Sequence, residues 1–277
     1  MALLIKKTML KKKHDTIILL LSVPLAILTA IASYAGIFVE STYARESTLY
    51  ASQGIGQDIV NLFIVVPILL ISSFYASRKS KPGLLVWSGA IFYLAYSYTI
   101  YSFGLHFNQL FILYCAILGL SFYSFVYFIL SAHKVNTAEL FSDKISTRST
   151  GVFLIVIAVL FYFIWLSELI PSINQNVTPK SVIESGLLIN PVHVLDLAIC
   201  LPALLLTGIA LIKKRSIGFL LAPAMLIFCI FMAIAIAAMV LVMKSKGLDT
   251  DFVLFTIFGI ITVISIFILV RYVRTLK

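Results

Sequence analysis

Charged residues are scarce in this chain of 277 residues: Asp, Glu, Lys and Arg together make up 12% of it, and only 11 residues are acidic. A soluble globular domain carries roughly a quarter charged residues. Apolar residues make up 61% of the chain, and the mean hydropathy is +1.09. This composition excludes a soluble or disordered chain and predicts that most of the protein lies in lipid.

Cysteine is also scarce. Cys115, Cys200 and Cys229 each lie inside an apolar stretch, and no two of them have CxxC spacing. Thiols in such positions usually act as small packing residues. The cysteines therefore indicate neither a disulfide framework nor a cysteine-bound metal cluster.

Motifs of known chemistry are missing. The sequence contains no P-loop, no HExxH and no Lys in the middle of an apolar stretch that could hold retinal as a Schiff base. No two histidines are placed at one depth on two predicted helices, as a membrane haem would require. We expect no cofactor.

What the chain has instead is eight long apolar stretches. A helix crosses the hydrocarbon of a bilayer with about 20 residues, and inside lipid every backbone N–H and C=O must be paired within the segment. Long runs of Val, Ile, Leu and Phe favour helices over the alternating strands of a membrane barrel. The predicted spans are 17–39, 58–77, 83–104, 109–131, 150–170, 193–212, 217–243 and 252–270. The predicted fold class is an all-α integral membrane protein, with eight transmembrane helices in a single domain over 1–277.

Basic residues fall on alternate connections between these stretches. Of 21 Lys and Arg, 17 lie at the N-terminus, on the even-numbered connections or at the C-terminus. The other four are Arg45, Lys180, Lys244 and Lys246. The positive-inside rule therefore predicts that both termini are cytoplasmic.

The net charge of +10 divides by side. The predicted cytoplasmic side carries 17 basic and 3 acidic residues, a net +14, and the rest carries 4 basic and 8 acidic residues, a net −4. We expect the cytoplasmic face to contact anionic lipid and expect no nucleic-acid partner.

The first span has a second interpretation. Its basic start, apolar run and the small residues Ala30 and Ala32 also fit a cleavable signal peptide. About 23 apolar residues exceed the usual signal-peptide core and favour a spanning helix.

An internal duplication is suggested by a shift of 135 residues. The shift places Asp58 on His193, Pro67 on Pro202 and Gly83 on Gly218 without a gap. We predict repeat one over about 15–134 and repeat two over about 150–277, each of four spans. Units with an even number of spans have parallel orientation, as in some transporters. The alternative is that two apolar helices joined to a basic turn resemble one another by necessity.

Matching polar stripes define a candidate site. At 100° per residue, Asp58 and Asn61 share one face of the second span, and His193 and Asp196 share the same face of the sixth. Ionisable groups in hydrocarbon are costly, so these stripes should face the bundle interior, at its outer end. Capping at a helix start is an alternative role for Asp58.

Further candidates lie at a similar level or deeper. His106 follows the third span, and Glu168 closes the fifth. Tyr93 and Tyr96 lie near mid-depth in the third span, where they could line a cavity or form hydrogen bonds between helices.

The sequence leads us to expect a transporter or permease for a small solute or cation, bound at this polar site, rather than an enzyme. A membrane enzyme that binds a metal through His106, His193, Asp196 and Asp58 is an alternative. A non-catalytic membrane subunit or sensor is a third interpretation.

Overall fold

The computed structural model describes residues 2–132, 141, 146–250 and 252–276. The regular elements among them are helices, apart from an isolated bridge between Phe141 and Leu276. Eight of these helical segments are long and apolar enough to cross a membrane. They are Thr16–Phe38, Thr48–Ser77, Lys81–Gly104, Phe111–Ser131, Thr147–Asn174, Pro191–Ile212, Ser216–Ser245 and Phe255–Val273. The all-helical, eight-span class predicted from the sequence is thereby confirmed.

The first four spans contain an interrupted helix. The elements are α1 (Ala2–Phe38), the 3₁₀ turn η1 (Glu40–Thr42), α2 (Thr48–Val60), the π-helical η2 (Asn61–Val65), α3 (Val66–Ser77), α4 (Lys81–Gly104) and α5 (Phe111–Ala132). The segments α2, η2 and α3 run continuously as one span.

The last four spans contain an interruption of the same kind. The elements are α6 (Thr147–Asn174), the short α7 (Lys180–Ser185), α8 (Pro191–Leu195), the π-helical η4 (Asp196–Cys200), α9 (Leu201–Ile212), α10 (Ser216–Ser245) and α11 (Phe252–Val273). Here α8, η4 and α9 form one span.

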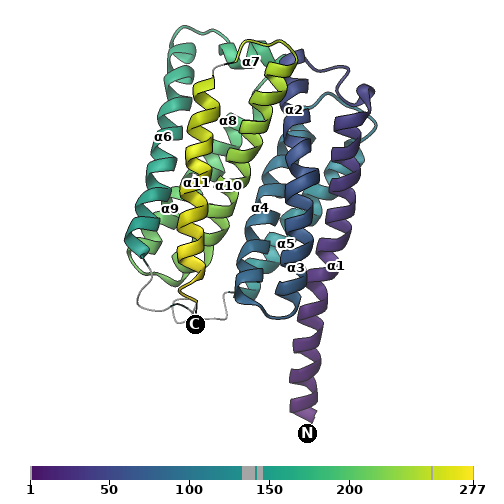
Figure 1. Cartoon of the computed structure of the whole chain (residues 1–277), viewed down its shortest axis with the longest axis vertical. Coiled ribbons are helices and arrows are strands. Elements are labelled where there is room, and N and C mark those ends of the chain that lie inside the picture. Colours follow the sequence, from purple (N-terminus) through teal and green to yellow (C-terminus); the bar gives the residue numbers. More distant parts are fainter. Residues whose placement is uncertain (1, 133–140, 142–145, 251, 277) are drawn as a thin grey trace.

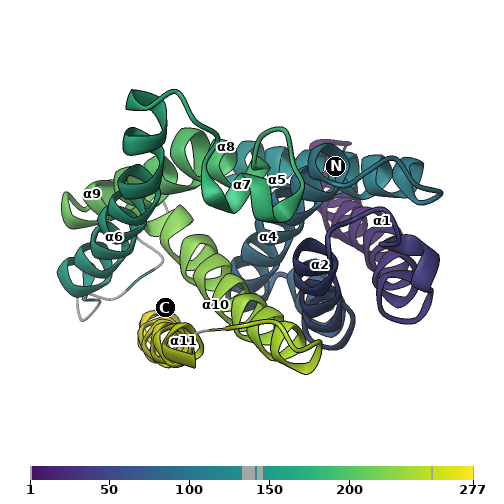
Figure 2. The same cartoon turned by 90° about the horizontal axis from the view of Figure 1, so that it is seen from above.

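Helices α4 and α10 form the centre of the bundle and pack against each other. Helix α4 also packs against α3 and α5, while α10 also packs against α2, α9 and α11. Figure 2 shows α1, α2 and α5 on one side of this central pair and α6 and α9 on the other. The α1 and α11 ends that are nearest the chain termini lie at one end of the bundle (Figure 1), which we call the proximal end. The opposite end, with α7, is the distal end.

The two short proximal turns have the same geometry. Lys79 and Lys214, which are 135 residues apart, both have positive φ, at 66° and 54°. In each turn the next residue reaches back to a carbonyl of the preceding helix: Ser80 N–H to Tyr75 O, and Arg215 N–H to Ala210 O. This is the Schellman arrangement that ends a helix. The third proximal connection lies almost wholly outside the described residues.

Two predicted boundaries are wrong. The second span begins at Thr48 rather than 58, because the Ser47 hydroxyl caps it by accepting from the Tyr50 N–H, and because Gly56 lets α2 approach the α10 backbone. A Cβ on Gly56 would lie 2.5 Å from the Met239 Cα. The fifth span continues through Pro171 to Asn174.

Candidate functional site

Two helices of the bundle are interrupted at their polar stripes. The N–H of Val66 bonds to the Asn61 carbonyl, and the N–H of Leu201 bonds to the Asp196 carbonyl, in the wider π register. Proline follows at 67 and 202 and offers no N–H, so carbonyl groups of the preceding turn lose their helical donor. The Tyr162 hydroxyl donates to one of them, Leu197 O, at 3.3 Å. Such π segments are frequent at functional sites.

Asp58 forms the first centre and is fully buried. The Tyr43 hydroxyl donates to its Oδ2 at 2.5 Å. The Tyr101 hydroxyl lies 3.1 Å from Oδ1 and 3.2 Å from the Gly54 carbonyl, and it can donate to either. Burial raises the pKa of the Tyr43 phenol well above its usual range, and the Asp58 carboxyl raises it further, so Tyr43 stays a donor.

A glycine makes room for this carboxyl. A Cβ placed on Gly36 of α1 would lie 1.7 Å from Asp58 Oδ2 and 3.0 Å from the Tyr43 hydroxyl. The side chain of Asp58 therefore projects onto bare α1 backbone. Glycine at 36 is required by this contact, because any larger residue would displace the carboxyl.

Asn61 lies one turn after Asp58, at the start of η2, and is fully buried. Neither its amide nitrogen nor its amide oxygen has a hydrogen-bond partner among the described residues. The Tyr93 hydroxyl on α4 is also buried without a hydrogen-bond partner among the described residues. The Tyr93 ring packs edge-on against Phe231 of α10, with the ring centroids 5.3 Å apart.

Asp196 forms the second centre and is 8% exposed. The Tyr96 hydroxyl donates to its Oδ1 at 2.9 Å, and the Trp165 indole N–H donates to its Oδ2 at 2.8 Å. No described Lys or Arg forms an ion pair with Asp196 or with Asp58.

A cavity of about 50 Å³ reaches the second centre. Its polar lining includes Asp196 and Tyr96. The remaining walls are almost entirely apolar side chains of α6, α9, α10 and α11, among them Phe161 and Phe258, whose ring centroids are 6.0 Å apart. The volume is sufficient for a few water molecules or a small solute group.

His193 does not pair directly with Asp196. Its Nε2 lies 4.0 Å from Glu168 Oε2, and its ring packs on Trp165 with the centroids 4.7 Å apart. Glu168 Oε1 also accepts from the Ser181 N–H of α7. Trp165 therefore links the His193 pair to Asp196, because its indole contacts both.

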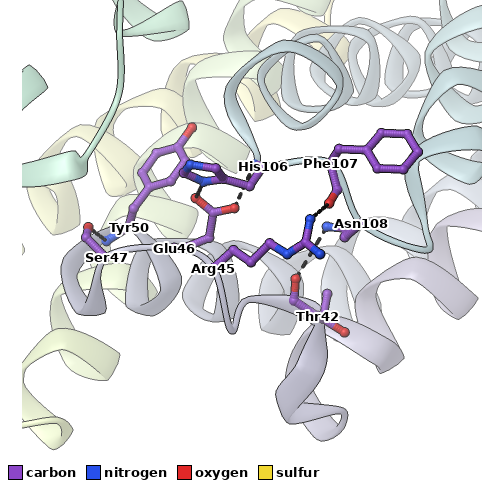
Figure 3. A network of polar contacts seen from close by, with 8 residues as sticks. All are labelled: Thr42, Arg45, Glu46, Ser47, Tyr50, His106, Phe107 and Asn108. Atoms are coloured by element: carbon purple, nitrogen blue, oxygen red, sulfur yellow. Dashed lines mark hydrogen bonds and ion pairs between the residues drawn. The ribbon is translucent and has the colours of Figure 1, made fainter.

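His106 belongs to a third, superficial network at the distal end (Figure 3). Glu46, whose side chain is 1% exposed, accepts from the His106 N–H at 2.8 Å and lies 3.0 Å from its Nδ1. Arg45 donates to the Phe107 carbonyl at 2.9 Å. These contacts hold the α1–α2 connection against the α4–α5 turn and line a polar cavity of about 140 Å³.

The residues predicted to form one site at the outer end have separate sets of polar partners in the structure. Asp58 does not cap a helix start: it lies ten residues after Thr48, which is about 15 Å along the helix. The described residues contain no group of three His, Cys, Asp or Glu side chains that could hold a metal ion. The sequence analysis did not identify Tyr43, Tyr101 and Trp165 as partners of the two carboxyls. Of these, Trp165 could have been noticed, because the chain has only two tryptophans.

Comparison of the chain with family models, curated proteins and solved structures gives no match. Helix length and composition define the class, which is a multi-pass membrane protein whose spans contact the lipid bilayer.

Proposed function

We propose that this protein transports a small cation, or a solute coupled to one, across the membrane, with Asp58 and Asp196 as the binding groups. The observation that carries the proposal is the pair of buried carboxyls, each on a π-interrupted span and each bonded to uncharged donors. Ionisable groups held inside a bundle are costly and mark ion or substrate pathways.

The arrangement of the two interruptions supports a pair of parallel four-helix repeats. The π segments begin at Asn61 and Asp196, 135 residues apart, and the same spacing relates Pro67 to Pro202. It also relates the positive-φ residues Lys79 and Lys214. Transporters commonly place their sites where repeats meet, on helices with irregular backbone.

The cavity at Asp196 supports a solute-binding role for the second half. In the first half α1 packs against α5. In the second half the corresponding helices α6 and α11 both contribute side chains to the lining of the Asp196 cavity. A carboxyl at the end of an apolar cavity attracts a group that donates hydrogen bonds or carries positive charge.

The alternative of a shared metal centre is not favoured. Zinc needs its ligands at about 2.0–2.2 Å from one point, and His106 and His193 contact Glu46 and Glu168 instead. A purely structural subunit is also less favoured, because it has no use for buried carboxyls without cationic partners.

Ion flux into proteoliposomes tests the proposal. Purified protein is reconstituted, a membrane potential is imposed, and the entry of protons and of radioactive sodium is measured against protein-free vesicles. We expect entry of at least one of the two ions, and a loss of about tenfold or more on Asp58→Asn or Asp196→Asn, as is typical when a charged binding group is removed.

Asp249→Asn provides the matched control. Asp249 is exposed in the distal connection between α10 and α11, so the same chemical change there should leave the flux unchanged. If neither ion enters faster than in protein-free vesicles, the proposal is wrong.

A further inference from the structure

Five side chains with oxygen atoms lie on the first π-interrupted span or on the helices α1 and α4 that pack against this span. Thr29 and Ser33 lie one turn apart on α1, which packs against η2, and Tyr98 comes from α4. With Asp58 and Asn61 they are all fully buried. Ser33 lies close enough to interact with both Asp58 and Tyr98.

Four of these five side chains form no hydrogen bond of normal geometry within the described part of the chain, although Ser33 lies near Asp58 and Tyr98. They are the Thr29, Ser33 and Tyr98 hydroxyls and the Asn61 amide. A buried polar atom without a partner costs about 1–3 kcal/mol, and a ligand that bonds to it offsets this cost. Several of them around one carboxyl indicate that the protein provides them for a ligand.

The chemistry of the cluster selects that ligand. Carboxylate, hydroxyl and amide oxygens are hard donors, which favour cations such as those of the alkali and alkaline-earth metals. Asp58 is the only acidic side chain among the five, so a monovalent ion would leave the cluster neutral. A divalent ion would leave an uncompensated charge in the low-dielectric interior, which is strongly unfavourable.

We infer that the Asp58 carboxyl, with the oxygens of Asn61, Ser33 and Tyr98, binds an alkali-metal ion between α1, η2 and α4. Tyr43 and Tyr101 hold the carboxyl from its other side, and Gly36 lets it reach α1. A carboxylate has about four lone-pair sites, so two phenol donors leave acceptor capacity for an ion. The inference rests on the proposed function, and it specifies the class of ion that binds at the first centre.

Thermal melting in different salts tests the inference on the full-length purified protein. Melting temperatures are compared in sodium, lithium, potassium and choline chloride at equal ionic strength. At saturation we expect at least one alkali-metal ion to raise the melting temperature by about 5 °C over choline, because an ion that binds only the folded state stabilises it. Asp58→Asn should abolish this rise.

Ser33→Ala keeps the test decisive if Asp58→Asn fails to fold. Loss of one oxygen ligand should raise the half-saturating ion concentration about tenfold and leave the melting temperature in choline nearly unchanged. Ser124→Ala is the matched control, because Ser124 is equally buried but its hydroxyl bonds to the Leu120 carbonyl of its own helix.

Equal melting of the wild type in all four salts would overturn the inference. So would a Ser33→Ala variant that melts lower in every salt with an unchanged half-saturating concentration, since that indicates packing alone. Ion flux without a salt-dependent melt would leave the transport proposal standing and refute only the ion at Asp58. A salt-dependent melting temperature without ion flux would support the ion at Asp58 and refute the transport proposal.

Discussion

The substitution Gly36→Ala introduces a single methyl group where α1 meets the Asp58 carboxyl. Its Cβ would lie 1.7 Å from Asp58 Oδ2 and 2.8 Å from Asp58 Cγ, so the carboxyl must move. Overpacking of this kind costs about 1–3 kcal/mol. Displacing the buried carboxyl from Tyr43 costs about 1–3 kcal/mol more, and the higher helix propensity of alanine returns about 1 kcal/mol. We expect a net loss of about 1–5 kcal/mol, which lowers the melting temperature by roughly 2–10 °C.

Thermal melting of the purified variant, monitored by circular dichroism, measures this loss. Gly119→Ala and Gly259→Ala are the controls, because an added Cβ at either helical position meets nothing within 4 Å. The cost of Gly36→Ala should also shrink in an Asp58→Ala background, where the clashing carboxyl is gone, since contacting residues are energetically coupled. A Gly36→Ala variant that melts like the two controls, or that costs the same with and without Asp58, would refute the described contact.

Two further predictions concern the second centre and the orientation of the chain. In a Trp87→Phe background Trp165 is the only tryptophan. Asp196→Asn should then shift the fluorescence emission of Trp165, because the indole N–H loses a carboxylate partner, whereas Asp249→Asn should not. Equal spectra for both variants would contradict the Trp165–Asp196 hydrogen bond. With the three native cysteines replaced by alanine, single cysteines at Arg78 and Lys213 should react with an impermeant label only from the cytoplasmic side, and those at Lys180 and Lys246 only from outside. Labelling of all four from one side would contradict an eight-span topology.

Hydropathy was sufficient to predict the class of the protein and seven of the eight spans approximately. It failed at the start of the second span, because Thr48–Gln57 is polar and rich in glycine. That segment is helical through the Ser47 cap and through close packing of Gly56 on α10. Tertiary contacts of this kind leave no signal in a hydropathy window.

The two centres were predictable in part. Asp58 and Asp196 stand out in any sequence scan, because ionisable residues in apolar stretches are rare. Their partners could not be found in the same way. Tyr96 and Asp196 are 100 residues apart, and Trp165 belongs to another helix whose rotation only packing determines. His193 and Asp196 share a helix face in the sequence, but His193 contacts Glu168 and Trp165, which belong to another helix.

The structure does not test the repeat prediction. Its sequence basis was Pro67 with Pro202 and the basic turns. The π segments begin at the same spacing of 135 residues, each six residues before one of these prolines. The parallel repeats remain a prediction.

Flux of sodium and protons into proteoliposomes tests the central claim most directly, namely that the buried carboxyls Asp58 and Asp196 conduct a cation through the bundle. The account predicts ion entry by the wild type and by Asp249→Asn, and a loss of about tenfold or more in Asp58→Asn and Asp196→Asn at equal protein incorporation. Entry of both ions at the wild-type rate in the two buried-carboxyl variants would contradict it.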